Sequence, residues 1–90
     1  MNAHIKRVID LLNEMDREIQ AAELENVDIC SAGVDVSNCK EIHVFGWENF
    51  KALIGSAPIV STNIGGDCLN FKNIATIDGV ELLCLTDEPM

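Results

Sequence analysis

The stretch FKNIATIDGVELLCLT, residues 71–86, decides the fold of the C-terminal half of the chain. Two runs rich in β-branched and apolar residues flank Asp78-Gly79, a pair that tolerates the positive φ angles of a type I′ turn. The stretch therefore predicts a β-hairpin with strands over 71–77 and 80–86. The run VELLCL is apolar on both faces, which is typical of a strand in the middle of a sheet.

Upstream of the hairpin, changes in hydrophobic period predict three more strands and a short helix. In chain order they are a strand over 27–36, a strand over 42–45, a helix over 47–54 and a strand over 59–62. The alternation of the first strand slips at Ser31–Gly33, which predicts a β-bulge or a break there. Gly55 is well placed to end the helix, and Pro58 suits the start of the following strand.

A long amphipathic helix is predicted from about Asn2 to Leu24. Asn2 is a suitable N-cap, and no Gly or Pro interrupts the next twenty residues. Apolar side chains recur at alternating spacings of three and four, as in a heptad seam. The seam consists of Ile5, Val8, Leu12, Met15, Ile19 and Ala22. Such a helix either lies on the sheet, which we favour, or associates through the first five seam residues with a second copy or a partner helix.

Together these elements predict an α+β fold in one small domain over residues 1–90. The predicted order is α-β-β-α-β-β-β. We expect an antiparallel sheet of about five strands, with the long N-terminal helix packed on one face.

The charge of the chain excludes some classes of function. Fifteen acidic residues against six basic ones give a net charge of −9. A nucleic-acid-binding protein needs a basic footprint, so we expect no direct binding of nucleic acid. No apolar run approaches the roughly 20 residues that cross a bilayer, and the first residues lack the apolar core of a signal peptide. We therefore expect a cytoplasmic protein that does not enter membranes.

No motif in the chain predicts catalysis, a cofactor or a metal site. The cysteines are Cys30, Cys39, Cys68 and Cys84, and none has a second cysteine at the spacing of a zinc knuckle. In a reducing compartment we expect all of them to be free thiols. A small thiol or zinc protein that uses Cys39 and His43 remains an alternative. Our expectation is a protein that is not an enzyme and needs neither cofactor nor metal.

Two groups of residues are candidates for binding a partner. Asp10, Glu14 and Glu18 are spaced four apart and line one face of the long helix. They form either an ordinary solvated face or a surface that meets a basic partner. Trp47 and Phe50 form the second group, because Trp is enriched at binding hot spots. The alternative for these aromatic residues is that they seal the junction between helix and sheet.

The segments IHVFGWENFKALIG (42–55) and IATIDGVELLCL (74–85) resemble parts of small phage- and prophage-encoded accessory proteins of Gram-positive bacteria. The resemblance covers about the last half of the chain, and its shared features are structural. It implies no catalytic or binding residue. It does imply an accessory or anti-defence role, since such proteins often bind a host protein or sequester a small signal.

From charge and resemblance we expect a small acidic interaction protein without enzymatic activity. It would be a phage or mobile-element inhibitor, of the anti-CRISPR or another anti-defence type, that occludes a basic nucleic-acid-binding surface of a host protein and can form a homodimer. The alternative is a homo-oligomeric sponge that sequesters a nucleotide-like signal. Outside the long helix only Lys40, Lys51 and Lys72 could meet its phosphates.

Overall fold

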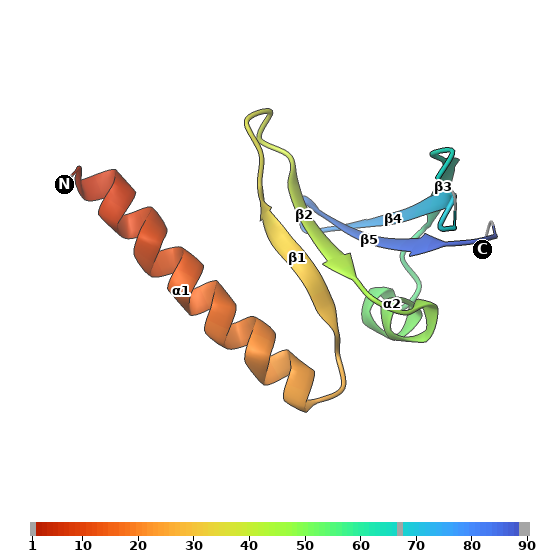
Figure 1. Ribbon diagram of the computed structural model, residues 1–90, viewed down its shortest axis with the longest axis horizontal. Helices are drawn as coiled ribbons and strands as arrows, with labels where there is room; N and C mark the ends of the chain where they lie inside the picture. Colours follow the sequence, from red (N-terminus) through yellow and green to blue (C-terminus); the bar gives the residue numbers. More distant parts are fainter. Residues whose placement is uncertain (1, 67, 89–90) are drawn as a thin grey trace.

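A computed structural model describes residues 2–66 and 68–88 of the chain. In these residues the predicted α+β class and the predicted order of elements are confirmed (Figure 1). The elements are α1 (Ala3–Leu24), β1 (Ile29–Val34), β2 (Lys40–Val44), α2 (Trp47–Ile54), β3 (Val60–Asn63), β4 (Phe71–Ile77) and β5 (Val80–Thr86).

The strands form one sheet in the order β1-β2-β5-β4-β3, so the apolar strand β5 is central as predicted. Three neighbouring pairs are antiparallel, but β2 and β5 run parallel. The prediction of a purely antiparallel sheet is therefore wrong. After β2 the chain passes through α2, β3 and β4 before β5 enters beside β2, and such a long crossover is the connection that parallel pairs need.

Local signals in the sequence act as predicted. The Asn2 side-chain oxygen accepts hydrogen bonds from the backbone N–H groups of His4 and Ile5, at 2.7 and 3.2 Å, and so caps α1. Asp78 and Gly79 have φ angles of 52° and 79°, as a type I′ turn requires. The bulge in β1 lies between Ile29 and Ser31, just before the predicted slip.

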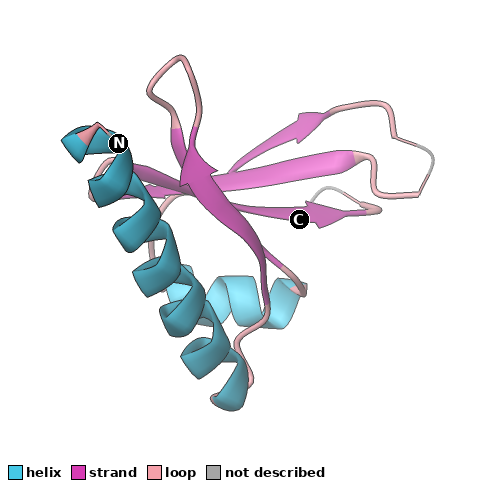
Figure 2. Ribbon diagram, turned by 60° about the vertical axis from the view of Figure 1, so that its left-hand side comes forward, coloured by secondary structure: helices cyan, strands magenta, loops and turns pink. Residues whose placement is uncertain are grey.

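The core lies between α2 and the centre of the sheet. Phe50 and Ile54 of α2 pack against Val44, Ala75 and Cys84, which come from three neighbouring strands. All five side chains are buried. An isolated helix of eight residues is not stable in water, so this packing is what holds α2 in place (Figure 2).

Helix α1 is not packed across one face of the sheet as predicted. It lies beside the edge strand β1, and none of its 22 residues is buried (Figures 1 and 2). Only Met15, Ile19 and Ala22 of the seam are half-buried, and the N-terminal half of the helix stands away from the strands. The physical reason is that α2 covers the centre of the face on which α1 lies, so that α1 is left with the edge beside β1. The molecule is elongated as a result, with extents of 46 × 31 × 26 Å.

Candidate functional site

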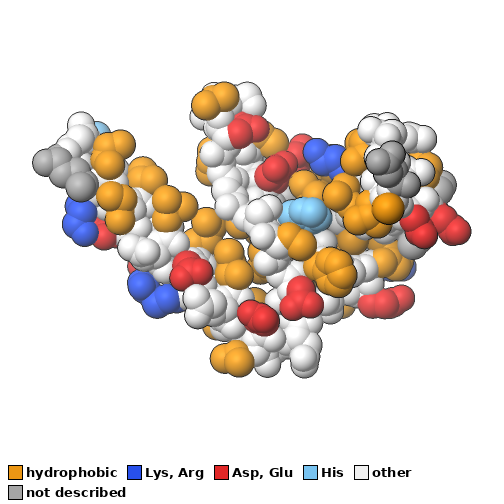
Figure 3. Space-filling model, in the orientation of Figure 1, with side chains coloured by type: hydrophobic (Ala, Val, Ile, Leu, Met, Phe, Trp, Pro, Cys, Tyr) orange, Lys and Arg blue, Asp and Glu red, His pale blue; other side chains and the backbone are white. Residues whose placement is uncertain are grey.

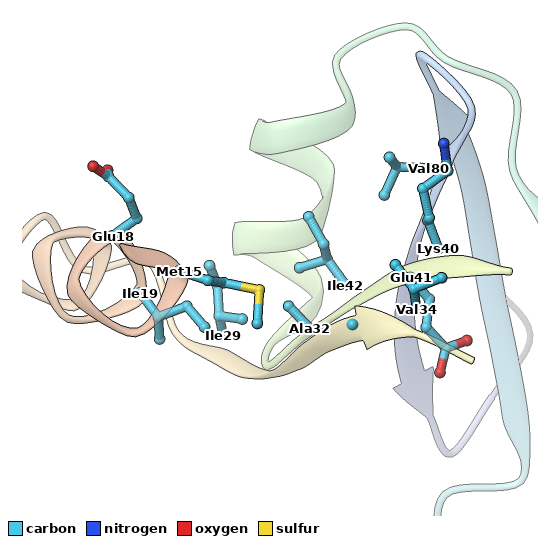
Figure 4. A pocket seen from close by; sticks show the side chains of 11 residues that line it. Met15, Glu18, Ile19, Ile29, Ala32, Val34, Lys40, Glu41, Ile42 and Val80 are labelled. Atoms are coloured by element: carbon cyan, nitrogen blue, oxygen red, sulfur yellow. The ribbon is translucent and has the colours of Figure 1, made fainter. Parts of the chain in front are cut away.

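An open apolar groove lies between α1 and the outer strands of the sheet. Its volume is about 330 Å³, and its accessible lining is almost wholly apolar. Met15 and Ile19 form the helix wall, and Ala32 and Ile42 belong to the floor (Figure 4). Glu18 lies at the rim and points away from the strands. A groove of this composition suits apolar side chains better than a charged ligand.

The predicted self-association residues fall into two groups. Met15 and Ile19 are half-buried at the groove. Ile5, Val8 and Leu12 are 53%, 49% and 52% exposed, which leaves a row of large apolar side chains in water. Soluble monomers rarely expose such a continuous apolar patch, and patches of this kind usually mark interaction sites.

The three acids of the predicted partner-binding row have different environments. Asp10 forms an ion pair with Lys6, whose Nζ lies 2.8 Å from Asp10 Oδ1. Glu14 is exposed, and Glu18 is at the rim of the groove. The row is therefore accessible, but it does not form a uniform acidic face.

The aromatic candidates Trp47 and Phe50 face the core. Phe50 is fully buried, so its prediction as a partner-binding residue is wrong. Trp47 is half-buried against the core, and its ring centroid is 5.6 Å from that of Phe50. The alternative interpretation, in which the aromatic residues seal the junction between helix and sheet, is the one that the packing supports.

A second acidic group, which the sequence did not indicate, surrounds Cys39 at the end of the sheet. Glu41 and Glu81 are register partners in the parallel pair of β2 and β5. The Cys39 thiol donates a hydrogen bond to Glu81 Oε2 at 3.3 Å. One potential ligand atom from each of Cys39, Glu41 and Glu81 lies within 4.8 Å of those of the other two. We call Asp35, Glu41 and Glu81 the acidic cluster.

The acidic cluster raises the pKa of the Cys39 thiol. The hydrogen bond to Glu81, partial desolvation, and the charges of Glu81, Asp35 and Glu41 all raise the pKa of Cys39 above its usual value of 9.0. The acidic cluster therefore disfavours the thiolate, which is the form of cysteine that acts as a nucleophile.

Asp35 organises the turn between β1 and β2. Its Oδ1 accepts hydrogen bonds from the Ser37 hydroxyl and from the backbone N–H groups of Ser37 and Cys39. These bonds, the one from the Ser37 hydroxyl first among them, lower the pKa of Asp35. The turn thus places the Asp35 carboxylate and Cys39 close together.

The alternative that pairs Cys39 with His43 is not supported by the geometry. Four residues along an extended strand separate two Cα atoms by about 13 Å. His43 lines a different pocket, together with Cys30 and Phe45. No signal in the sequence could have placed Glu41 beside Glu81, because their proximity depends on the parallel register of strands 40 residues apart.

Searches for related proteins found no match to the chain among protein-family models, curated proteins or solved structures. Within residues 2–66 and 68–88, no helix combines the length and the apolar character that crossing a membrane requires.

Proposed function

We propose that this protein is an interaction protein without enzymatic activity, and that its acidic surface covers a basic surface of another protein. One observation carries the proposal. In the part of the chain that the structure describes, Lys6–Asp10 is the one ion pair, although the chain has fifteen acidic residues. The other described carboxylates are not neutralised by a cation within the molecule, so they remain available to one outside it.

The acidic cluster brings carboxylates of this surface close together. Glu41 and Glu81 are register partners on neighbouring strands and repel each other, and Asp35 is near enough to act on the same thiol. Arg or Lys side chains of a partner would relieve this repulsion and would be attracted over several ångströms. Figure 3 shows acidic side chains near the turn between β1 and β2 and along the lower edge of this face, whereas on α1 basic side chains lie beside the acidic ones.

A binding role fits the local chemistry better than a catalytic one. The acidic cluster raises the pKa of the Cys39 thiol and so disfavours a nucleophilic thiolate, and His43 belongs to another pocket. The apolar groove offers an accessible lining without a convergent set of polar groups. On the strength of the resemblance to phage-encoded accessory proteins, we extend the proposal to an inhibitor that a phage or mobile element encodes and that acts on a basic host protein in the cytoplasm.

The test is a comparison of charge variants against a captured partner. Tagged wild-type protein captures partners from host cells, and binding to each purified partner is then measured by surface plasmon resonance at several salt concentrations. The variant Glu41→Gln with Glu81→Gln removes two charges from the acidic cluster and keeps the side-chain shapes. The control, Asp16→Asn with Glu23→Gln, removes two charges from α1.

We expect the cluster variant to associate about tenfold more slowly at low salt and to lose most of its salt dependence. The control should change the association rate less than about twofold. Equal kinetics for wild type and cluster variant would contradict the proposal. A thermal shift with cyclic nucleotides, in a protein that captures no basic partner, would favour the sequestering alternative instead.

A further inference from the structure

The geometry points to a second copy of this chain as the occupant of the apolar groove. We infer a symmetric homodimer in which the N-terminal half of α1 from each copy fills the groove of the other. This inference goes beyond the proposed function and does not depend on it. Three properties of the described residues carry it: excess surface, apolar complementarity and the distribution of charge along α1.

The chain exposes more surface than a compact monomer of its size. Its accessible surface is 6472 Å², whereas a compact protein of 9.8 kDa exposes roughly 5,200 Å². A specific interface needs about 800 Å² from each partner, and the excess is about 1,300 Å². The radius of gyration agrees, at 14.5 Å against about 12 Å for a compact chain of this length.

The exposed half of α1 and the groove are both apolar, so the same chain carries two surfaces that can bury each other. Ile5, Val8 and Leu12 continue the seam that Met15 and Ile19 begin at the groove wall, but they do not line the groove of their own copy and are about half exposed. Ile9 and Leu11 widen this apolar stripe, at 38% and 45% exposure. Each copy therefore presents both an unfilled apolar groove and an unburied apolar helix face, as an isologous interface requires.

The charges of α1 favour an antiparallel arrangement of the two helices. Residues 3–12 carry two basic and one acidic side chain, whereas residues 13–24 carry four acidic and one basic. In an antiparallel pair the slightly basic half of one helix meets the acidic half of the other. A parallel pair would place the two acidic halves side by side, where like charges repel.

The experiment measures molar mass by sedimentation equilibrium between about 1 µM and 1 mM protein, for wild type and matched variants. Leu12→Glu places a charge in the proposed interface. Leu24→Glu is the control, because it makes the same change on the same helix at a side chain that is 88% exposed and outside the seam. Circular dichroism checks that each variant keeps its helix content.

We expect wild type and Leu24→Glu to sediment at twice 9.8 kDa. Leu12→Glu should stay folded, and the dissociation constant of its dimer should be at least about thirtyfold higher than that of wild type. Should Leu12→Glu lose its fold, Leu12→Ala retains helix propensity and should still weaken the dimer about tenfold. A wild type that stays monomeric at 1 mM, or an equally tight dimer of the folded Leu12 variants, would overturn the inference.

Orientation is tested by the distance between spin labels at His4→Cys, with Cys30, Cys39 and Cys68 changed to Ser. An antiparallel pair that crosses near Leu12 separates the two labels by more than about 20 Å, given a rise of 1.5 Å per residue. A shorter distance would show a parallel pair, and it would contradict the inference that each α1 fills the groove of the other copy.

Discussion

The Cys39 thiol donates a hydrogen bond to the Glu81 carboxylate at 3.3 Å and so joins residues that are 42 positions apart in the chain. The contact exists because β2 and β5 run parallel with Glu41 opposite Glu81. It links the turn after β1 to the central strand, and it concentrates negative charge around a protonated thiol.

The first prediction concerns the reactivity of Cys39. The carboxylate of Glu81 raises the pKa of Cys39, so Glu81→Gln should lower that pKa and speed alkylation near pH 8. The measurement is the rate of iodoacetamide labelling in a background with Cys30 and Cys68 changed to Ser. The matched control is Glu48→Gln, on exposed α2 surface, which should leave the rate unchanged. An unaltered rate in Glu81→Gln would show that the contact does not persist in solution.

The second prediction concerns a buried polar network. Asn73 is fully buried, and its Nδ2 donates to Thr86 Oγ1 at 2.9 Å and to the Cys84 carbonyl at 3.1 Å. The Ser61 hydroxyl donates to Asn73 Oδ1. Asn73→Ala should lower the free energy of unfolding by about 1–3 kcal/mol, because the buried Thr86 hydroxyl and Cys84 carbonyl each lose a hydrogen-bond partner. Urea unfolding measures this, with exposed Thr76→Ala as the control, and equal midpoints would refute it.

The third prediction compares the cysteines by how much stability each contributes. Cys68 is exposed, and a Ser in place of Cys39 can still donate to Glu81, so Cys39→Ser with Cys68→Ser should cost less than about 0.5 kcal/mol. Cys84 is fully buried in the core, so Cys84→Ser should cost about 1–3 kcal/mol. Urea unfolding distinguishes the two cases. Zinc retained at one equivalent after purification and lost with Cys39→Ser would instead support the metal alternative.

The fourth prediction concerns the acidic row on α1. Changing Asp10, Glu14 and Glu18 together to Gln removes repulsion between neighbouring acids but also the Lys6–Asp10 ion pair. These effects are each a few tenths of a kcal/mol, so stability should change by less than about 0.5 kcal/mol. Association with a basic partner should slow and lose salt dependence. The control changes Asp16, Glu23 and Glu25 to Gln. If the triple variant binds like wild type at every salt concentration, the row is only a solvated face.

The fifth prediction is a pH dependence of the turn between β1 and β2. Hydrogen bonds to the Asp35 carboxylate lower its folded pKa below the usual 3.8. Their contribution is therefore present above pH 3.8 and disappears as pH falls through the lower folded value. Hydrogen exchange of the Cys39 amide, which donates to Asp35, should accelerate relative to a β4–β5 amide over that range. In Asp35→Ala, the Cys39 amide should show no such acceleration relative to the β4–β5 amide as the pH falls.

Much of the fold could be predicted from the sequence because the relevant signals are local. The cap at Asn2, the turn at Asp78-Gly79 and the end of α2 at Gly55 each depend on the conformational preferences of a few neighbouring residues. Hydrophobic period likewise identified the helices and strands, since it reports which side chains must be buried in a given type of element.

The tertiary structure alone decided which elements are neighbours and which surfaces stay open. Alternation along a strand specifies its buried face but neither its partner nor its direction, so the parallel pairing of β2 with β5 was missed, and with it the contact of Cys39 with Glu81. For the same reason, the hydrophobic period predicted an apolar face on α1 but did not indicate which element covers that face. Packing of α2 over the sheet centre buries Phe50 and leaves Leu12 in water, because one face of a small sheet has room for only one central helix.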